Sequence, residues 1–409
     1  MVLEEPRLHR RGYVAAVVSR WQVHVEKKMK VVKFGVIGCG LMGREFGSAT
    51  ARWCHLQGMT ARPEIVAVCD TQPELTRWFT DNLPSIKQVT QDYRALLANP
   101  DVEAVYIAVP HHLHAELYCA AIEAGKSLMG EKPFGIDKQA NDKIMACLAK
   151  HPQVFARCSS ESPFFPAVQR IGRMLEAQAF GRIIEVNSGF LHSSDLDPGK
   201  PINWKRLLAC NGEYGAMGDL GMHACHMPFR AGWFPKDVRA VLSKIVSQRP
   251  DGKGGMAPCE TWDNATLLCT AAGTDGALFP LTIKTQRIAP GHKNTWYLEI
   301  LGTKASARWS SKQINTIEVL EYNGGEQAWQ VIDMGHEMAF KTITGVNFEA
   351  GFSDSILQMW AAFLHELVTG APLSRYASCV TPAEVARSHS LFTAALKSQA
   401  KATTELVGQ

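Results

Sequence analysis

The chain lacks paired cysteines, long apolar runs and blocks of basic residues, and each absence excludes a class of protein. Its eleven cysteines are an odd number and include no CxxC pair, which is typical of reduced, buried thiols and predicts a cytoplasmic protein. No apolar run approaches the roughly 20 residues of a membrane span, so we expect no membrane partner. A net charge of +4, with no Lys/Arg block in the body of the chain, gives no reason to expect nucleic acid. The expected partner is a small molecule.

Established metal-ligand spacings and nucleophile motifs are also missing. Ser159 and Ser160 lack the context of a nucleophile elbow. Two groups of candidate ligands lie close in sequence without zinc spacing, namely His111, His112 and His114, and His223, Cys225 and His226. We therefore predict that the protein binds no metal.

The length of 409 residues predicts two domains, because one hydrophobic core rarely organises so long a chain. Residues 1–28 contain arginines and a short apolar patch, Tyr13 to Val18. That patch is shorter than the usual signal-peptide core of about 7 to 15 residues, and no small-residue cleavage site follows it. We interpret 1–28 as an N-terminal extension, 29–155 as a first domain and 156–409 as a second.

The first domain alternates strand and helix signals, which predicts a parallel sheet flanked by helices. Short apolar runs rich in β-branched residues predict its strands, and 3.6-residue periodicity predicts its helices. The expected strands are Val31 to Ile37, Glu64 to Cys69, Asp101 to Val109 and Ser127 to Met129, and the expected helices are Arg44 to His55, Pro73 to Asn82 and His114 to Ala124.

The second domain changes character, because from Arg182 onward strand-like runs follow one another without helices between them. Such a succession predicts a mostly antiparallel sheet. Two helices are expected near the end, at Ser353 to Thr369 and Thr381 to Gln399. The predicted fold class is α/β, with an N-terminal Rossmann domain and a C-terminal α+β domain.

A glycine-rich turn follows the first strand and opens the first helix. In Gly38-x-Gly40-x-x-Gly43 the first glycine allows a tight turn, the second admits a pyrophosphate and the third lets helix and strand pack closely. Asp70, at the end of the second strand, can accept hydrogen bonds from an adenosine ribose 2′-OH and would repel a 2′-phosphate, which favours NAD over NADP. The interval from the glycines to Asp70 is long, and we interpret it as a loop around Leu56 to Pro63. The alternative is that Asp70 is a solvated turn residue.

Two further segments carry groups suited to catalysis. Glu131-Lys132-Pro133 follows a predicted strand at the carboxyl edge of the sheet, where open α/β folds bind ligands. Asp219 and His223 are four residues apart, so on a helix the carboxylate could orient the imidazole or share a substrate hydroxyl with it. The alternatives are a surface Glu and Lys beside a turn, and a structural Asp-His pair.

Together these motifs resemble the Gfo/Idh/MocA oxidoreductases. The resemblance rests on Ile37-Gly-Cys-Gly-Leu-Met-Gly, Val109-Pro with His114, Ala124-Gly-Lys-Ser-Leu-Met-Gly-Glu-Lys-Pro and Gly-Asp219-Leu-Gly-Met-His223. It implies a large open sheet in the second domain, often used for oligomer contacts, and hence a homo-oligomer (dimer, tetramer or larger). It also implies a cis Lys132-Pro133 peptide.

The resemblance assigns roles to individual residues. Lys132, Asp219 and His223 match the active-site residues of the family: the lysine contacts the reacting hydroxyl and the histidine exchanges its proton. Further cofactor contacts are implied at Leu41, Met42, Pro110, His114, Glu131 and Lys132. Two segments depart from the family pattern, Glu213-Tyr214-Gly215 before Asp219 and Glu161-Ser-Pro-Phe-Phe-Pro after the first domain. Contacts near both segments should differ from those of the family.

The predicted function is NAD-dependent hydride transfer to or from a secondary ring hydroxyl of a sugar, glycoside or cyclic polyol, with pyranose C3 favoured. In the loop Asp195 to Arg206, Trp204 could stack on a pyranose ring while Lys205, Arg206 or Asp195 bond its hydroxyls. Trp204 could equally be a core anchor. Two other functions stay open, an NAD-dependent glycosidase acting through transient oxidation and a non-catalytic NAD-binding regulator.

Overall fold

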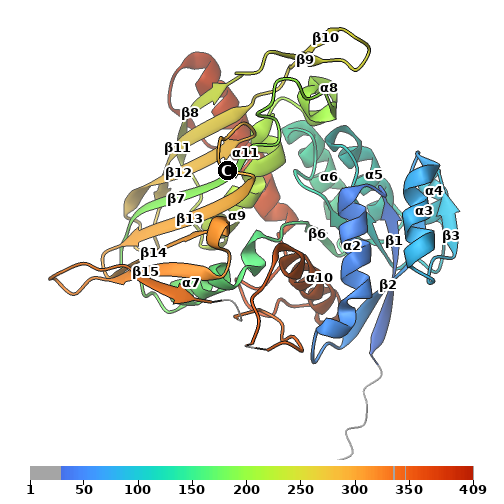
Figure 1. Cartoon of the computed structure of the whole chain (residues 1–409), viewed down its shortest axis with the longest axis horizontal. Coiled ribbons are helices and arrows are strands. Elements are labelled where there is room, and N and C mark those ends of the chain that lie inside the picture. Colours follow the sequence, from blue (N-terminus) through green and yellow to red (C-terminus); the bar gives the residue numbers. More distant parts are fainter. Residues whose placement is uncertain (1–28, 335–336, 346, 409) are drawn as a thin grey trace, which may run out of the picture.

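The computed structural model describes residues 29–334, 337–345 and 347–408, and two sheets with their helices make up this part of the chain (Figure 1). The predicted N-terminal extension, 1–28, lies outside the described residues.

The first sheet is parallel throughout, with the strand order β3-β2-β1-β4-β5-β6 of a Rossmann fold. Its central strands are mostly apolar and buried, apart from Lys30 and Lys33 in the first half of β1, because helices cover both faces. The strands are β1 (Lys30–Ile37), β2 (Ala61–Cys69), β3 (Gln88–Thr90), β4 (Ala104–Ile107), β5 (Ser127–Gly130) and β6 (Ala156–Cys158). The helices are α2 (Leu41–Ala51), α3 (Pro73–Asn82), α4 (Tyr93–Leu97), α5 (His114–Glu123) and α6 (Lys138–Lys150).

The structure shifts some predicted boundaries. Helix α2 starts at Leu41, three residues before the predicted start, because it begins directly after the glycine turn. It ends at Ala51, and a 3₁₀ turn at Trp53–His55 follows instead of further α-helix. Strand β2 already starts at Ala61, so the long interval before Asp70 contains a short turn and a long strand as well as a loop.

The second sheet has nine strands in the order β16-β15-β14-β13-β7-β12-β11-β8-β17. Only the β7–β12 pair is parallel among its described pairs, which confirms the mostly antiparallel prediction. Alternating burial along β11 and β12 shows that one face is packed and the other is open. Its strands are β7 (Ile183–His192), β8 (Asp237–Ser243), β11 (Asn264–Ala272), β12 (Leu278–Gln286), β13 (Asn294–Gly302), β14 (Ala305–Ser310), β15 (Thr316–Glu321), β16 (Gln330–Asp333) and β17 (Glu405–Leu406).

Helices cover the packed face of the second sheet, with α9 (Met222–Arg230) against β7 and α11 (Pro382–Lys401) against β8 (Figure 1). The remaining elements are α7 (Pro166–Glu176), α8 (Leu208–Asn211) and a hairpin of β9 (Gln248–Pro250) and β10 (Met256–Pro258). Both helices expected near the end are present, at Phe352–Thr369 (α10) and Pro382–Lys401.

The packing crosses the predicted domain boundary at residue 155. Strand β6 pairs with β5 as the last strand of the parallel sheet. Helix α10, far along the chain, packs on α2 and β2 (Figure 1). Its Trp360 stacks on Phe46 in the core of the first sheet. The chain after residue 350 therefore returns to the Rossmann sheet and joins the two halves around one cavity.

The structure also bears on the cysteines, on membrane spans and on metal sites. All eleven cysteines are free, and nine of them are buried. Within the described residues, no helix is long and apolar enough to cross a membrane, and no group of three His, Cys, Asp or Glu side chains is arranged to hold a metal.

Candidate active site

A cavity of about 1020 Å³ lies where the carboxyl ends of the parallel strands meet the second sheet. Its volume is at the upper end of the range typical of small-molecule sites. Most of the predicted site residues line it: Gly38, Gly40, Leu41, Met42, Asp70, Pro110, Glu131, Lys132, Trp204, Asp219 and His223. The structure thus brings motifs from both domains to one place.

The glycine turn forms one end of this cavity. Gly38 has a φ of +96°, and a Cβ there would lie 2.3 Å from the carbonyl oxygen of Ala108. A Cβ on Gly43 would lie 2.3 Å from the carbonyl oxygen of Gly38, so Gly43 serves close packing and does not line the cavity. Gly40 faces open space, and no side chain caps α2, whose first N–H groups are free to bind an anion.

Asp70 is held beside the glycine turn. Its Oδ2 accepts a hydrogen bond from the Cys39 N–H at 2.8 Å, and its Oδ1 accepts one from the Gln72 N–H at 2.9 Å. The carboxylate lines the cavity next to the start of α2. The turn, the uncapped helix and this carboxylate together fit a dinucleotide with an unmodified ribose.

Lys132 lines the cavity from the segment that follows β5. The Lys132-Pro133 peptide is cis, as the resemblance implied. The ammonium donates to the Asp219 backbone oxygen at 2.5 Å and to Asp219 Oδ1 at 2.8 Å. Burial lowers the pKa of Lys132, with Arg287 acting in the same direction and the carboxylates of Glu131 and Glu161 opposing it.

Asp219 lies in a π-helical turn, Met217–Gly221, that precedes α9. Its buried carboxylate contacts three cations, those of Lys132, Lys205 and Arg287. Within the described residues His223 is not among its hydrogen-bond partners, so the expected orienting contact is not formed. The wider π turn breaks the four-residue α-helical spacing on which that prediction rested.

His223 has a different partner. Its Nδ1 lies 2.9 Å from the Ser160 hydroxyl, and the rings of Phe190 and Trp296 meet the imidazole edge-on. Burial, followed by the charge of Lys132, lowers the pKa of His223 well below its usual value, so the ring is neutral at neutral pH. No sequence pattern links Ser160 to His223, which are 63 positions apart.

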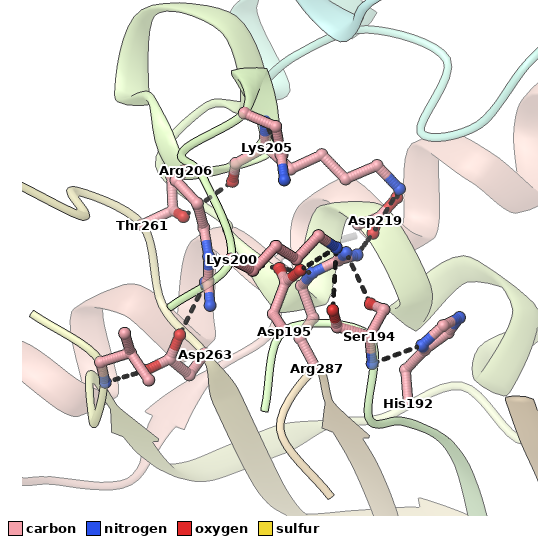
Figure 2. A network of polar contacts seen from close by, with 12 residues as sticks. His192, Ser194, Asp195, Lys200, Lys205, Arg206, Asp219, Thr261, Asp263 and Arg287 are labelled. Carbon is pink, nitrogen blue, oxygen red and sulfur yellow. Dashed lines mark hydrogen bonds and ion pairs between the residues drawn. The ribbon is translucent and has the colours of Figure 1, made fainter. Parts of the chain in front are cut away.

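Besides Gly43, two further predicted site residues lie outside the cavity. Arg206 is fully buried, with Nε 3.2 Å from Asp195 Oδ2 and Nη1 2.6 Å from Asp263 Oδ1, so it cannot bind substrate as predicted (Figure 2). Its neighbour Lys205 lines the cavity instead. His114 is fully buried behind the wall, where Nε2 lies 3.0 Å from the Val109 carbonyl oxygen, so a direct cofactor contact is not formed.

Trp204 is half-buried and lines the cavity, which makes it a wall residue and not only a core anchor. Its ring meets His111 edge-on at 4.9 Å between centroids, and the Lys205 ammonium lies 5.5 Å from its ring centroid. This wall offers an aromatic surface beside a cation.

Several lining residues were not assigned roles from the sequence, among them His192, Glu161 and Arg287. Glu161 is buried, and burial together with the Glu131 carboxylate raises its pKa to about 7. Arg287 continues the inward-facing alternation of β12, after Leu281 and Ile283. An arginine at an inward-facing position needs a buried partner. Its place in the alternating pattern of the strand could therefore have identified Arg287 from the sequence.

The fold and the glycine-turn end of the cavity define a dinucleotide-binding Rossmann protein with a second, sheet-forming domain. Residues 32–157 match the family model described as an oxidoreductase family with an NAD-binding Rossmann fold, and residues 168–308 match the model of the GFO/IDH/MocA C-terminal domain. The chain belongs to the Gfo/Idh/MocA oxidoreductase family and carries an NAD-binding Rossmann domain.

Several characterised proteins are similar to this chain. Levoglucosan dehydrogenase of Pseudarthrobacter phenanthrenivorans is 28% identical over 307 residues, which cover 71% of this chain and 76% of that protein. Trans-1,2-dihydrobenzene-1,2-diol dehydrogenase of Mus musculus is 24% identical over 288 residues, covering 66% and 81%. A solved structure of levoglucosan dehydrogenase with NADH and levoglucosan has a TM-score of 0.80 at 24% identity, over 93% of this chain and 100% of that one. The structural likeness supports the fold.

Proposed function

We propose that the protein is an NAD-dependent dehydrogenase that oxidises a secondary ring hydroxyl of a sugar, glycoside or cyclic polyol, with pyranose C3 as the favoured position. The observation that carries this proposal is the presence of Lys132, Asp219 and His223 in the same cavity as the glycine turn. Relatives named for dehydrogenation of levoglucosan and of a diol support the reaction class.

The glycine-turn end would hold the cofactor. The free N–H groups at the start of α2 would bind its pyrophosphate, and Asp70 would accept hydrogen bonds from the adenosine ribose and repel a 2′-phosphate. When bound, the nicotinamide ring supplies the hydride acceptor or donor.

Lys132 would position the reacting hydroxyl and stabilise negative charge as it develops on the oxygen. Its ammonium is fixed by two contacts to Asp219 and keeps one N–H for the substrate. Because Asp219 is itself held by Lys205 and Arg287, the ammonium is anchored without depending on a bound ligand.

His223 would accept the hydroxyl proton. For Nε2 to be the acceptor, Nδ1 must carry the ring hydrogen and donate it to the Ser160 hydroxyl, and the 2.9 Å separation allows this. The neutral ring that burial enforces is the form that a proton acceptor requires. Ser160 would act as the positioning residue that fixes the tautomer.

The second candidate is a glycosidase that works through transient oxidation. One observation favours it: Glu161 is a buried carboxyl group in the same cavity, with a pKa of about 7 that suits proton transfer to a leaving group. Net production of NADH separates the two functions, because a transient oxidation returns the hydride.

The test is a panel of pyranoses, glycosides and inositols, run with NAD and with NADP, in which NADH formation and release of free sugar are both followed. The proposal expects NADH from NAD with one class of compound. Release of free sugar without net NADH would contradict it and favour the glycosidase. Binding of NAD with neither product would favour a regulator.

A further inference from the structure

The substrate end of the cavity adjoins a network of ion-paired side chains, most of them buried (Figure 2). Three carboxylates are linked through shared ion pairs to five cations. The carboxylates are Asp195, Asp219 and Asp263, and the cations are Lys132, Lys200, Lys205, Arg206 and Arg287. The Lys200 side chain is 40% exposed, so solvent screens its charge, and the carboxylates of Glu131 and Glu161 offset the charge of Lys132. The shortfall of negative charge therefore falls on Lys205. Because buried charges are normally paired, an anion in the cavity would complete its pairing.

The cavity wall at this point offers hydrogen-bond donors and no free acceptor on Asp219. Both Asp219 carboxylate oxygens already accept from cations, Oδ1 from Lys132 and Lys205 and Oδ2 from Lys205 and Arg287. His192 Nδ1 accepts from the Ser194 N–H at 3.1 Å, which leaves the ring hydrogen on Nε2. Lys205, Arg287 and His192 therefore present N–H groups to the cavity.

Lys205 is the least compensated of these cations. Within the described residues its one ion-pair partner is Asp219, which it shares with two other cations. Burial and the nearby charges of Arg287 and Lys132 lower its pKa well below the usual value. Glu131 and Glu161 raise the pKa of Lys132, and neither is an ion-pair partner of Lys205 or Arg287 in the described part of the chain.

We propose that the substrate is a sugar acid, whose carboxylate is held by Lys205, Arg287 and His192. The inference rests on the proposed dehydrogenase function and adds the class of substrate to it. A carboxylate supplies acceptors for all three donors and brings a negative charge to Lys205, which shares its one ion-pair partner among the described residues with two other cations. We favour it over a phosphate because Asp195 and Asp219, bound to the same cations, repel a dianion about twice as strongly as a monoanion.

The proposal makes Trp204 and Lys205 parts of one recognition surface. The aromatic ring can cover an apolar face of the sugar while the adjacent ammonium, 5.5 Å from the ring centroid, meets the acid group. Arg206 contributes from behind, because its ion pairs with Asp195 and Asp263 fix the segment that carries Lys205.

Binding affinities of matched ligands test this directly. The enzyme saturated with NADH is titrated with methyl glucuronide and methyl glucoside, then with gluconate and glucitol, by calorimetry. We expect the acid of at least one pair to bind roughly 10–100-fold more tightly than its neutral partner, the range for a charge-assisted hydrogen bond. Equal binding in both pairs would overturn the proposal, as would tighter binding of methyl glucoside 6-phosphate than of the glucuronide.

Three variants assign the effect to Lys205. Lys205→Met should reduce the preference for the acid to within about threefold, and Lys205→Arg should retain it. Lys200→Met is the matched control, because Lys200 lies 2.9 Å from Asp195 in the same network but does not line the cavity. A preference that survives in Lys205→Met, or that is lost equally in Lys200→Met, would contradict the assignment.

The outcomes also separate this inference from the proposed function. NADH formation from neutral sugars, without preference for the acids, overturns the sugar-acid inference and leaves the dehydrogenase function intact. Selective binding of the acids without NADH from any compound leaves the carboxylate site intact and overturns the dehydrogenase function.

Discussion

The two ends of the cavity are built in different ways. The cofactor end is organised by backbone, with a glycine turn and an uncapped helix start, and by Asp70, whose carboxylate is held beside that turn. The substrate end consists of buried side chains joined by ion pairs between distant segments: Lys132 and Arg287 reach Asp219 across 87 and 68 positions. Changes at one end should therefore affect cofactor binding, and changes at the other should affect turnover.

The largest difference between the effect on turnover and the effect on cofactor binding is expected for Lys132→Ala. Removal of a donor aimed at a developing oxyanion costs about 10²–10³-fold in kcat. The affinity for NAD should stay within about twofold, because the glycine turn and Asp70 are untouched. Steady-state kinetics and a fluorescence titration with NADH measure the two quantities. A variant with full turnover would remove the lysine from the mechanism.

Two glycine variants test how the backbone builds the cofactor end. Gly38→Ala forces a side chain into a φ of +96° and against the Ala108 carbonyl oxygen, which should lower the free energy of unfolding by about 1–3 kcal/mol or more and weaken NAD binding. Gly40→Ala has open space around its Cβ, so it should leave stability unchanged and weaken NAD binding alone. Urea unfolding and NADH titration check both, and equal destabilisation of the two variants would contradict the assigned roles.

Glu161 lies between the two ends and gives a pH-dependent test. Its folded-state pKa of about 7 exceeds the usual glutamate value of 4.5, so the folded protein binds more protons than the unfolded chain between these two pH values. Wild-type stability should therefore fall as pH rises from about 5 to 7. In Glu161→Gln this contribution disappears, and the variant should gain roughly 1–3 kcal/mol relative to wild type over that range. Parallel curves of the free energy of unfolding against pH for wild type and Glu161→Gln would contradict this prediction.

The smallest effect is expected for Asp70→Asn. The asparagine oxygen can still accept from the Cys39 N–H, so the turn should keep its shape. Loss of the negative charge removes the repulsion of a 2′-phosphate, and the preference for NAD over NADP should fall about tenfold, or roughly 1.4 kcal/mol. Affinities for both cofactors measure this preference. An unchanged ratio of the affinities for NAD and NADP would indicate that Asp70 is a turn residue without a role in cofactor selection.

The comparison also explains what the sequence could predict. Spacing within one short segment specifies a glycine turn, and helix α3 occurs at the predicted residues 73–82 because Pro at its start and clear periodicity define it. The π-helical turn at Asp219 was not predictable from an α-helical spacing, and the partners of Asp219 and His223 come from distant segments.

The neighbours Lys205 and Arg206 illustrate the same limit. Sequence reasoning offered both as hydrogen-bond donors to a sugar, yet one lines the cavity and the other is buried between Asp195 and Asp263. Their directions are set by a 3₁₀ turn, Trp204–Arg206, and by carboxylates from other segments, neither of which leaves a local signal. The same holds for helix α10, whose packing on the first sheet no local pattern predicts.

The most direct test of the central claim, hydride transfer from a ring hydroxyl in this cavity, is deuterium transfer. The best substrate of the sugar panel is deuterated at the reacting carbon and oxidised with NAD. The mass of the reduced cofactor is then measured by mass spectrometry. The account predicts one deuterium in each reduced cofactor, formed about 10²–10³-fold more slowly by Lys132→Ala. Unlabelled NADH, or deuterium recovered only in water, would contradict it.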